Sequence, residues 1–132
     1  MRRFLILGLV ALGLAMPAFA QRGGGGGPEI TTTIQVRSGT YAVRGRDASG
    51  QTYEGSAQIQ ATGPNTWRVT WRVDGETAQG VGLTVGDALV VGYTSGRETG
   101  VVIYGAEPNG NLTGLWTQGR EGGVGAETLM PR

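Results

Sequence analysis

The reactive side chains of this chain are carboxylates, hydroxyls and arginines, because the sequence has no histidine, cysteine or lysine. That composition excludes Ser-His-Asp and Cys-His nucleophilic systems, Schiff-base chemistry, thiol redox activity and zinc sites built on nitrogen or sulfur. Carboxylate pairs, which carry out glycoside hydrolysis, remain available. Glu54 and Glu127 fall inside expected strands, whereas most other acidic residues fall in or beside expected turns.

We therefore predict no catalytic residue, no metal site and no cofactor. No D-x-D-x-D-G calcium loop occurs in the sequence. A small hydrolase that uses Glu54 and Glu127 stays open as an alternative. It requires both carboxyl groups on one face of the sheet and within about 10 Å of each other.

Two tryptophans stand close together in the stretch PNTWRVTWRVDG, which runs from Pro64 to Gly75. A period of two places Trp67 and Trp71 on one side of a strand and Arg68 and Arg72 on the other. The tryptophans could line a ligand site or fill the core. We expect core filling, since buried aromatic rings dominate the energetics of small domains, and we expect Trp71→Ala to unfold the protein.

Turn signals recur every eight to twelve residues from about residue 30 onward, which is typical of an all-β sandwich or barrel. No stretch shows a helical period over ten residues, and glycine interrupts every segment. An additional strand over 30–37 is kept as an alternative. The predicted strands lie near 39–46, 51–61, 66–73, 76–85, 88–94, 99–106, 111–118 and 123–129.

Short connections favour antiparallel pairing of successive strands, which gives a meander. A meander of about eight strands exposes two edges unless it closes, so we predict a single up-and-down β-barrel, with a β-sandwich as the alternative. Polar residues alternate with apolar ones in most strands, so we expect one face to meet water. The glycines inside strands fit sharp coiling and close backbone approach.

The strands over 88–106 differ, because their apolar residues fall on both faces. Such runs are usually covered on both sides. The cover could be the N-terminal strand or a second subunit, so a homo-oligomer formed through 88–106 is one alternative.

The first twenty residues have the pattern of a secretory signal peptide. Arg2 and Arg3 precede an apolar run, and Ala18-Phe19-Ala20 forms an A-x-A cleavage site. We expect cleavage after Ala20, a Gly-rich flexible linker over 21–29 and the barrel domain over 30–132. The mature protein is then periplasmic or secreted, with no membrane insertion after cleavage.

The charge balance argues against a nucleic-acid partner. Loss of residues 1–20 removes two arginines and changes the formal charge from +1 to −1. The remaining arginines are scattered along the chain, whereas a nucleic-acid footprint clusters them.

Several short stretches at turn and core positions give the chain a family resemblance over roughly residues 39–130. They are Tyr53-Glu54-Gly55, Trp67-Arg68-Val69-Thr70-Trp71, Gly80-Val81-Gly82, Gly86-Asp87-Ala88-Leu89-Val90-Val91, Val101 to Gly105, Gly110 to Trp116, and Gly125-Ala126-Glu127. With these the chain resembles small exported bacterial proteins often labelled fibronectin-binding, a resemblance that implies a matrix-protein partner but supplies no binding residues. The Gly-x-Leu-x-Gly-x-Trp phrase is also similar to strands of avidin-like and lipocalin-like barrels.

These observations predict an exported, non-catalytic binding module whose partner is a protein or a small ligand. Its contact candidates are Arg68, Arg72, Tyr93 and Tyr104, because Arg and Tyr on an exposed sheet face are enriched at interfaces. An envelope structural protein that associates with itself through 88–106 is the second hypothesis.

Overall fold

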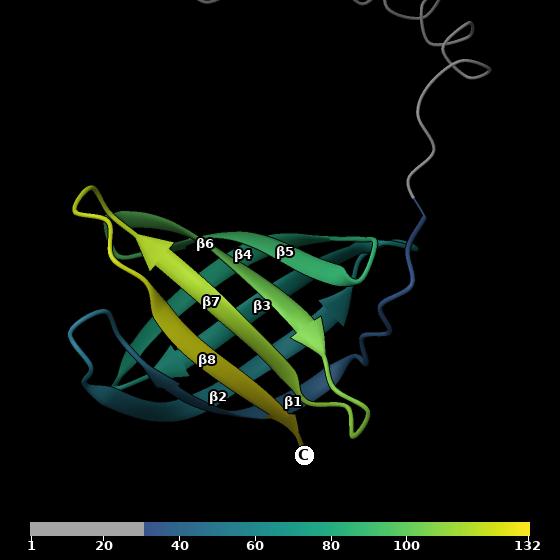
Figure 1. Ribbon diagram of the computed structural model, residues 1–132, viewed down its shortest axis with the longest axis horizontal. Helices are drawn as coiled ribbons and strands as arrows, with labels where there is room; N and C mark the ends of the chain where they lie inside the picture. The colour runs from purple at the N-terminus through teal and green to yellow at the C-terminus, as the bar shows by residue number, and fades with distance from the viewer. Residues whose placement is uncertain (1–30) are drawn as a thin grey trace, which may run out of the picture. The chain divides into compact units, whose positions relative to one another are not determined.

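The computed structural model of the chain describes residues 31–132, which fold as one closed β-barrel (Figure 1). The signal peptide and the linker expected at the N-terminus lie outside the described residues. Each strand pairs antiparallel with the next, and the last pairs with the first to close the barrel. The strands are β1 (Gly39–Arg46), β2 (Thr52–Ala61), β3 (Thr66–Val73), β4 (Glu76–Val85), β5 (Ala88–Ser95), β6 (Glu98–Ala106), β7 (Leu112–Gln118) and β8 (Gly125–Pro131).

The predicted up-and-down barrel is confirmed, and the sandwich alternative is wrong. The eight expected strands all form, with ends within two residues of those expected. Turn chemistry explains this agreement: Asp74 and Gly75 both have positive φ, 51° and 79°, as a two-residue hairpin loop requires. No helix long and apolar enough to cross a membrane occurs in residues 31–132.

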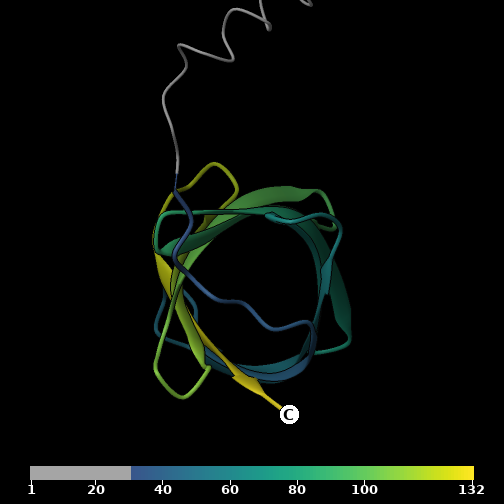
Figure 2. The same ribbon diagram turned by 90° about the vertical axis from the view of Figure 1, so that its right-hand side faces the viewer.

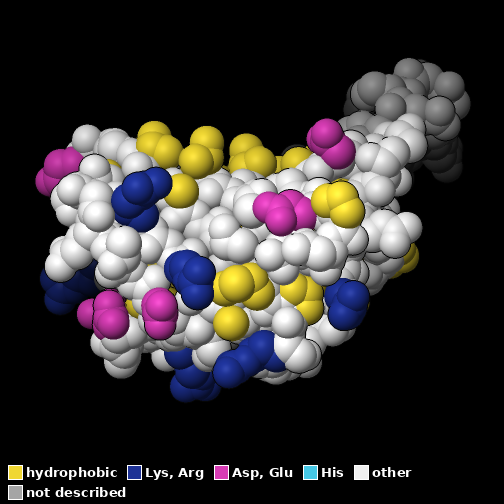
Figure 3. All heavy atoms as spheres, turned by 60° about the horizontal axis from the view of Figure 1, so that its bottom comes forward, with side chains coloured by type: hydrophobic (Ala, Val, Ile, Leu, Met, Phe, Trp, Pro, Cys, Tyr) yellow, Lys and Arg dark blue, Asp and Glu magenta, His cyan; other side chains and the backbone are white. Residues whose placement is uncertain are grey.

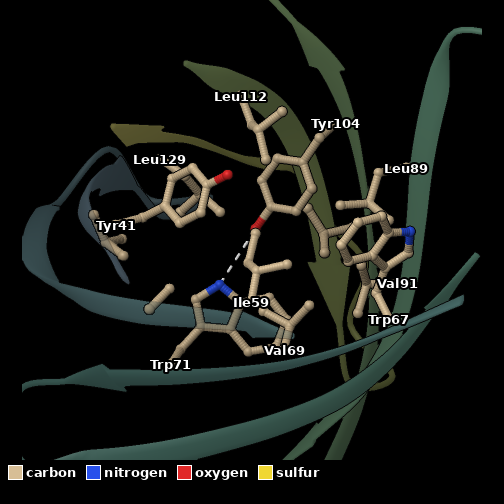
Figure 4. Close-up of a cluster of buried hydrophobic side chains, with 13 residues drawn as sticks. Tyr41, Ile59, Trp67, Val69, Trp71, Leu89, Val91, Tyr104, Leu112 and Leu129 are labelled. Carbon is tan, nitrogen blue, oxygen red and sulfur yellow. Dashed lines mark hydrogen bonds between the residues drawn. The ribbon is translucent and has the colours of Figure 1, made fainter. Parts of the chain in front are cut away.

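Inward side chains form one continuous core along the barrel axis, and both strand tryptophans belong to it (Figure 4). Trp67 is 8% exposed and Trp71 is 6% exposed. A ring of this size removes about 150–250 Å² of apolar surface from water, which contributes roughly 4–6 kcal/mol at 25 cal/mol per Å². The expectation that these tryptophans fill the barrel is confirmed.

Glycines inside the strands make room for large rings. In four places an inward glycine lies directly opposite an inward aromatic residue of the neighbouring strand, where a Cβ would overlap the ring. The pairs are Gly45 with Tyr53, Gly100 with Tyr93, Gly114 with Tyr104, and Gly125 with Trp116. The close approach expected of the strand glycines is therefore an approach of side chain to backbone across paired strands.

Residues 31–38 cross one end of the barrel and narrow it (Figure 2). Ile34 and Val36 pack against the core, and the Tyr41 hydroxyl donates a hydrogen bond to the backbone carbonyl of Arg37, 2.5 Å away. The backbone of this segment bonds to Gly86 in the β4–β5 turn. This end is the one at which both described chain ends lie.

The extra strand expected at 30–37 does not form in the described part of that range. Thr32 makes only an isolated bridge to Gly86, and residues 33–38 have no strand pairing. The barrel closes through β1 and β8, so no strand edge is left for this segment to join. It covers the barrel end, so the alternative in which the N-terminal strand covers 88–106 is wrong.

The outer surface is divided by charge. Outward strand residues of β1 to β3 include Arg44, Arg46, Glu54, Arg68 and Arg72, whereas those of β4 to β7 are all uncharged. Figure 3 shows a face on which basic and acidic side chains are interspersed with apolar ones.

Apolar residues on the outward face of β4 to β7 line up across the sheet. Leu83, Val90, Ile103 and Leu115 are successive register partners on these four strands. Ile103 is 52% exposed and Leu115 is 62% exposed. Within residues 31–132, no segment covers this row.

Candidate ligand-binding site

The end of the barrel opposite residues 31–38 contains a cavity of about 410 Å³. It is surrounded by the β1–β2, β3–β4 and β5–β6 hairpins and by the start of the β7–β8 connection. Cavities that bind small molecules usually measure about 300–1,000 Å³. Its lining residues are Asp47, Gln51, Thr52, Tyr53, Trp71, Val73, Asp74, Glu76, Ala78, Tyr93, Ser95, Val102, Trp116, Gln118 and Glu127.

Four aromatic rings form the walls of the cavity, in two packed pairs. The rings of Trp71 and Tyr93 have centroids 5.3 Å apart and planes tilted by 56°. Those of Tyr53 and Trp116 are 6.3 Å apart and nearly perpendicular, at 64°. Both arrangements are among those that aromatic pairs favour. The rings of Tyr53, Tyr93 and Trp116 pack against the backbone of the inward glycines described above, which restricts their positions.

The carboxylate of Glu127 lies at the inner end of the cavity and is 8% exposed. Its Oε1 accepts a hydrogen bond from the Tyr53 hydroxyl at 2.8 Å. Its Oε2 accepts bonds from the Tyr104 hydroxyl at 2.6 Å and from Trp71 Nε1 at 3.0 Å. Hydrogen bonds to an ionised acceptor are short and strong, so this network holds the residues of four strands in fixed positions.

The network leaves the carboxylate with spare acceptor capacity. A carboxylate offers about four lone-pair sites, and the three donors occupy two on Oε2 and one on Oε1. The remaining site is on Oε1. A donor on a bound molecule could use it without breaking a protein hydrogen bond.

Burial inside the barrel raises the pKa values of the tyrosines around the carboxylate. Desolvation is the larger cause, and the negative charge of Glu127 adds to it. The pKa of Tyr93 rises to about 12, and those of Tyr53 and Tyr104 are raised further above the usual value. These hydroxyls therefore stay neutral at physiological pH, and Tyr53 and Tyr104 act as donors to Glu127.

Acidic residues also surround the mouth of the cavity. Asp47, Asp74 and Glu76 line it, and no arginine among the described residues does so. The side-chain hydrogen bond from Ser49 and the backbone bond from Gln51 lower the pKa of Asp47, which keeps this carboxylate charged. The cavity is thus acidic both at its mouth and at its inner end.

The structure separates the four contact candidates predicted from the sequence. Arg68 and Arg72 are exposed on the outer face of β3, away from the cavity. Tyr93 lines the cavity, and Tyr104 is fully buried behind it. The expectation that the tyrosines lie on an exposed sheet face is wrong, because alternation gives Tyr93 the parity of the buried Val91 and gives Tyr104 that of Val102.

The proposed catalytic pair is also wrong. Glu54 points outward from β2 and is exposed, whereas Glu127 points into the barrel from β8. Two carboxyls on opposite faces of one sheet cannot flank a single substrate bond. Glu127 does carry a sequence signal of its own, since it shares the inward face of β8 with Leu129.

The tryptophan question has a double answer. Trp71 is buried in the core, and it also lines the cavity and donates to Glu127. Figure 4 shows its indole nitrogen directed toward the Tyr104 hydroxyl, 3.2 Å away. Trp67 lies nearer the other end and does not line this cavity. The two roles that the sequence left as alternatives are thus combined in one residue.

Comparison with known proteins identifies the architecture. No family model matches the chain, and no curated protein matches it. Solved structures do match, among them a redesigned β-barrel that is 20% identical, with a TM-score of 0.65 over 76% of this chain and 99% of the other. The chain therefore has the fold of small closed β-barrels.

Two further barrels of this kind are similar. The redesigned barrel mFAP1, bound to DFHBI, is 20% identical with a TM-score of 0.63 over 70% of this chain and 93% of the other. The redesigned barrel mFAP0, also bound to DFHBI, is 23% identical with a TM-score of 0.60 over 73% and 99%. At these identities the similarity shows the fold.

Proposed function

We propose that this chain is an exported, non-catalytic binding protein that holds a small molecule in the open end of its barrel. The observation that carries the proposal is the cavity itself: a hollow of about 410 Å³ with four aromatic walls and a buried carboxylate at its inner end. Ligand sites are typically apolar hollows with a few well-placed polar groups, and barrel mouths are a common location for them.

The barrel is built as a cup. Residues 31–38 cross one end, and the other end is hollow. The similar barrels mFAP1 and mFAP0 are bound to DFHBI, which supports the capacity of this architecture to bind a compound. Glu127 already accepts three protein hydrogen bonds. Glu54 points outward and cannot act with it as a catalytic pair, which favours a binding function over catalysis.

The three tryptophans provide the test, because two line the cavity and one does not. The indole N–H signals in a nitrogen–proton NMR spectrum should be followed while benzyl alcohol, a small aromatic probe, is added to millimolar concentration. Trp71 and Trp116 should shift with saturation while Trp67 stays in place. Absence of any shift, or equal shifts of all three signals, would contradict the proposal.

Export is tested separately. Expression of the full chain in a bacterium with fractionation should place the mature protein in the periplasm or medium, with Gln21 as its first residue. A cytoplasmic protein that begins at Met1 would contradict export.

The resemblance to proteins labelled fibronectin-binding adds a partner to the proposal, namely an extracellular-matrix protein. Immobilised fibronectin should then retain the mature chain. If it does not retain the chain, this partner is excluded and the small-ligand proposal is unaffected.

A second candidate function, self-association, is favoured by the uncharged outer face of β4 to β7. A second copy presents the same uncharged surface, so contact through the row that contains Leu83 and Ile103 would bury no charged side chain without a partner. Light scattering coupled to size exclusion should then show a dimer that Ile103→Lys converts to a monomer, with Gln58→Lys on the opposite face as the control. A monomeric wild-type protein would exclude this function.

A further inference from the structure

We propose that the ligand of the cavity is an organic cation, a protonated amine or similar group attached to an aromatic body. This inference rests on the proposed function and names the class of ligand. The first step is the charge of the lining: four carboxylates, of Asp47, Asp74, Glu76 and Glu127, line the cavity, and no arginine of the described residues lines it. An anion entering this space would meet only like charge.

The second step is the position of Glu127. A carboxylate that is 8% exposed has lost most of its contact with water, and its present partners are neutral donors. A buried charge is costly unless an opposite charge or good hydrogen bonds compensate for it. A ligand ammonium that reaches the open acceptor site on Oε1 would supply both an opposite charge and a hydrogen bond.

The third step is the nature of the walls. Trp71, Tyr93, Tyr53 and Trp116 surround the same space. The faces of such rings attract cations by about 0.5–1 kcal/mol at exposed sites and by about 2 kcal/mol when water is excluded. Aromatic walls are a recurring arrangement for binding alkylated ammonium groups. An apolar or aromatic body on the ligand would then fill the remaining volume beside the rings.

A metal ion fits the cavity less well than an organic cation. Although four carboxylates line it, no three acidic side chains among residues 31–132 come close enough together to hold a metal. Glu127 is separated from the mouth carboxylates by the depth of the cavity. The site thus offers one buried acceptor at the inner end and dispersed negative charge at the entrance.

Three arginines must be weighed against this proposal. Arg97 and Arg120 lie in loops at the same end of the barrel, and Arg46 is the last residue of β1 there. All three are exposed and none lines the cavity, so water and salt screen their effect on a ligand held near Glu127. They reduce the attraction of this end for cations in bulk solution and leave the inner end of the cavity acidic.

The experiment compares three probes of nearly equal size and different charge: benzylammonium, benzyl alcohol and benzoate. Each is titrated into the wild-type protein, with the Trp71 and Trp116 indole signals as the readout and Trp67 as the internal control. Benzylammonium should bind about tenfold more tightly than benzyl alcohol, which corresponds to about 1.4 kcal/mol, and benzoate should bind most weakly.

Variants locate the charge that matters. Glu127→Gln should remove most of the preference for benzylammonium over benzyl alcohol, so that the two probes bind with nearly equal affinity. The double variant Asp74→Asn/Glu76→Gln, at exposed positions, should lower benzylammonium affinity about twofold to threefold and reduce its dependence on salt. If Glu127→Gln does not fold, the double variant and the three wild-type titrations decide the question.

The outcomes separate the two proposals. If benzyl alcohol shifts Trp71 and Trp116 but benzylammonium binds no more tightly, the cation inference is overturned and the binding function stands. Tighter binding of benzoate would overturn it as well. If none of the three probes shifts these signals, both the binding function and the inference are overturned.

Discussion

Glu127→Gln tests the hydrogen-bond network at the inner end of the cavity. The substitution keeps the size and shape of the side chain but removes its charge, and it replaces one acceptor oxygen with an NH₂ group. Trp71 Nε1 can only donate, so the amide must turn its oxygen toward Trp71 and Tyr104 and its NH₂ toward Tyr53. Tyr53 must then turn its own proton away.

The magnitude follows from the three bonds that change. Hydrogen bonds to a charged group contribute about 1.5–3 kcal/mol each, and neutral ones about 0.5–1.5 kcal/mol. Replacing the charge therefore costs about 1 kcal/mol for each bond, or about 2–3 kcal/mol in all. Part of this is offset because the folded protein no longer buries a carboxylate. We expect the free energy of unfolding to fall by about 2 kcal/mol.

Urea denaturation followed by tryptophan fluorescence measures this change. Glu54→Gln is the matched control, since it makes the same chemical change at an exposed position on the outer face, where the loss should not exceed about 0.5 kcal/mol. Equal stability of Glu127→Gln and the wild type would refute the reasoning. A higher stability would show that burial of the charge outweighs the network.

Three further predictions concern the rings around the cavity. Gly100→Ala should lower the free energy of unfolding by about 1–3 kcal/mol, because the new Cβ would overlap the Tyr93 ring. Gly92→Ala is the control, since a Cβ at that position meets open space and should not destabilise the protein. Urea denaturation compares the two variants, and equal effects would contradict this steric explanation. Trp71→Ala should cost about 3–5 kcal/mol by the same assay, and an unchanged midpoint would exclude its core role. All four tyrosines have raised pKa values, and a raised pKa means that the folded state favours the neutral hydroxyl. The tyrosines therefore contribute their full stabilisation below the unfolded-state pKa of about 10. The free energy of unfolding should fall as pH rises through about 12, where Tyr93 ionises in the folded protein. Ultraviolet titration should show tyrosinate in the native protein only well above pH 10, and normal titration in urea; an ordinary titration in the native protein would contradict the burial.

The strands could be predicted from the sequence because local signals and the fold agree. Asp74-Gly75 sets a hairpin, and strict alternation through Trp67 to Val73 sets the inward face of β3. Closure of the barrel could also be predicted, since the two edge strands of an eight-stranded meander need hydrogen-bond partners. What alternation cannot give is the register between neighbouring strands, and register decides which glycine faces which ring.

The site was harder to predict for the same reason. Tyr53 and Glu127 are 74 positions apart in the chain and meet only because β1 lies between β2 and β8 in the closed barrel. The sequence indicates Tyr93 and Tyr104 as contacts, but the prediction places them on the wrong face, although their shared parity with the buried Val91 and Val102 indicates the inward face. Residues 31–38 gave no strand because their role is to cross the barrel end.

A crystal structure of the protein grown with benzylammonium tests the binding function of the open-end cavity most directly. The probe should lie inside the barrel mouth, with its ring against Trp71 or Tyr93 and its nitrogen within hydrogen-bond distance of Glu127 Oε1. A cavity occupied by the protein's own side chains, or a probe bound only on the outer face, would contradict it.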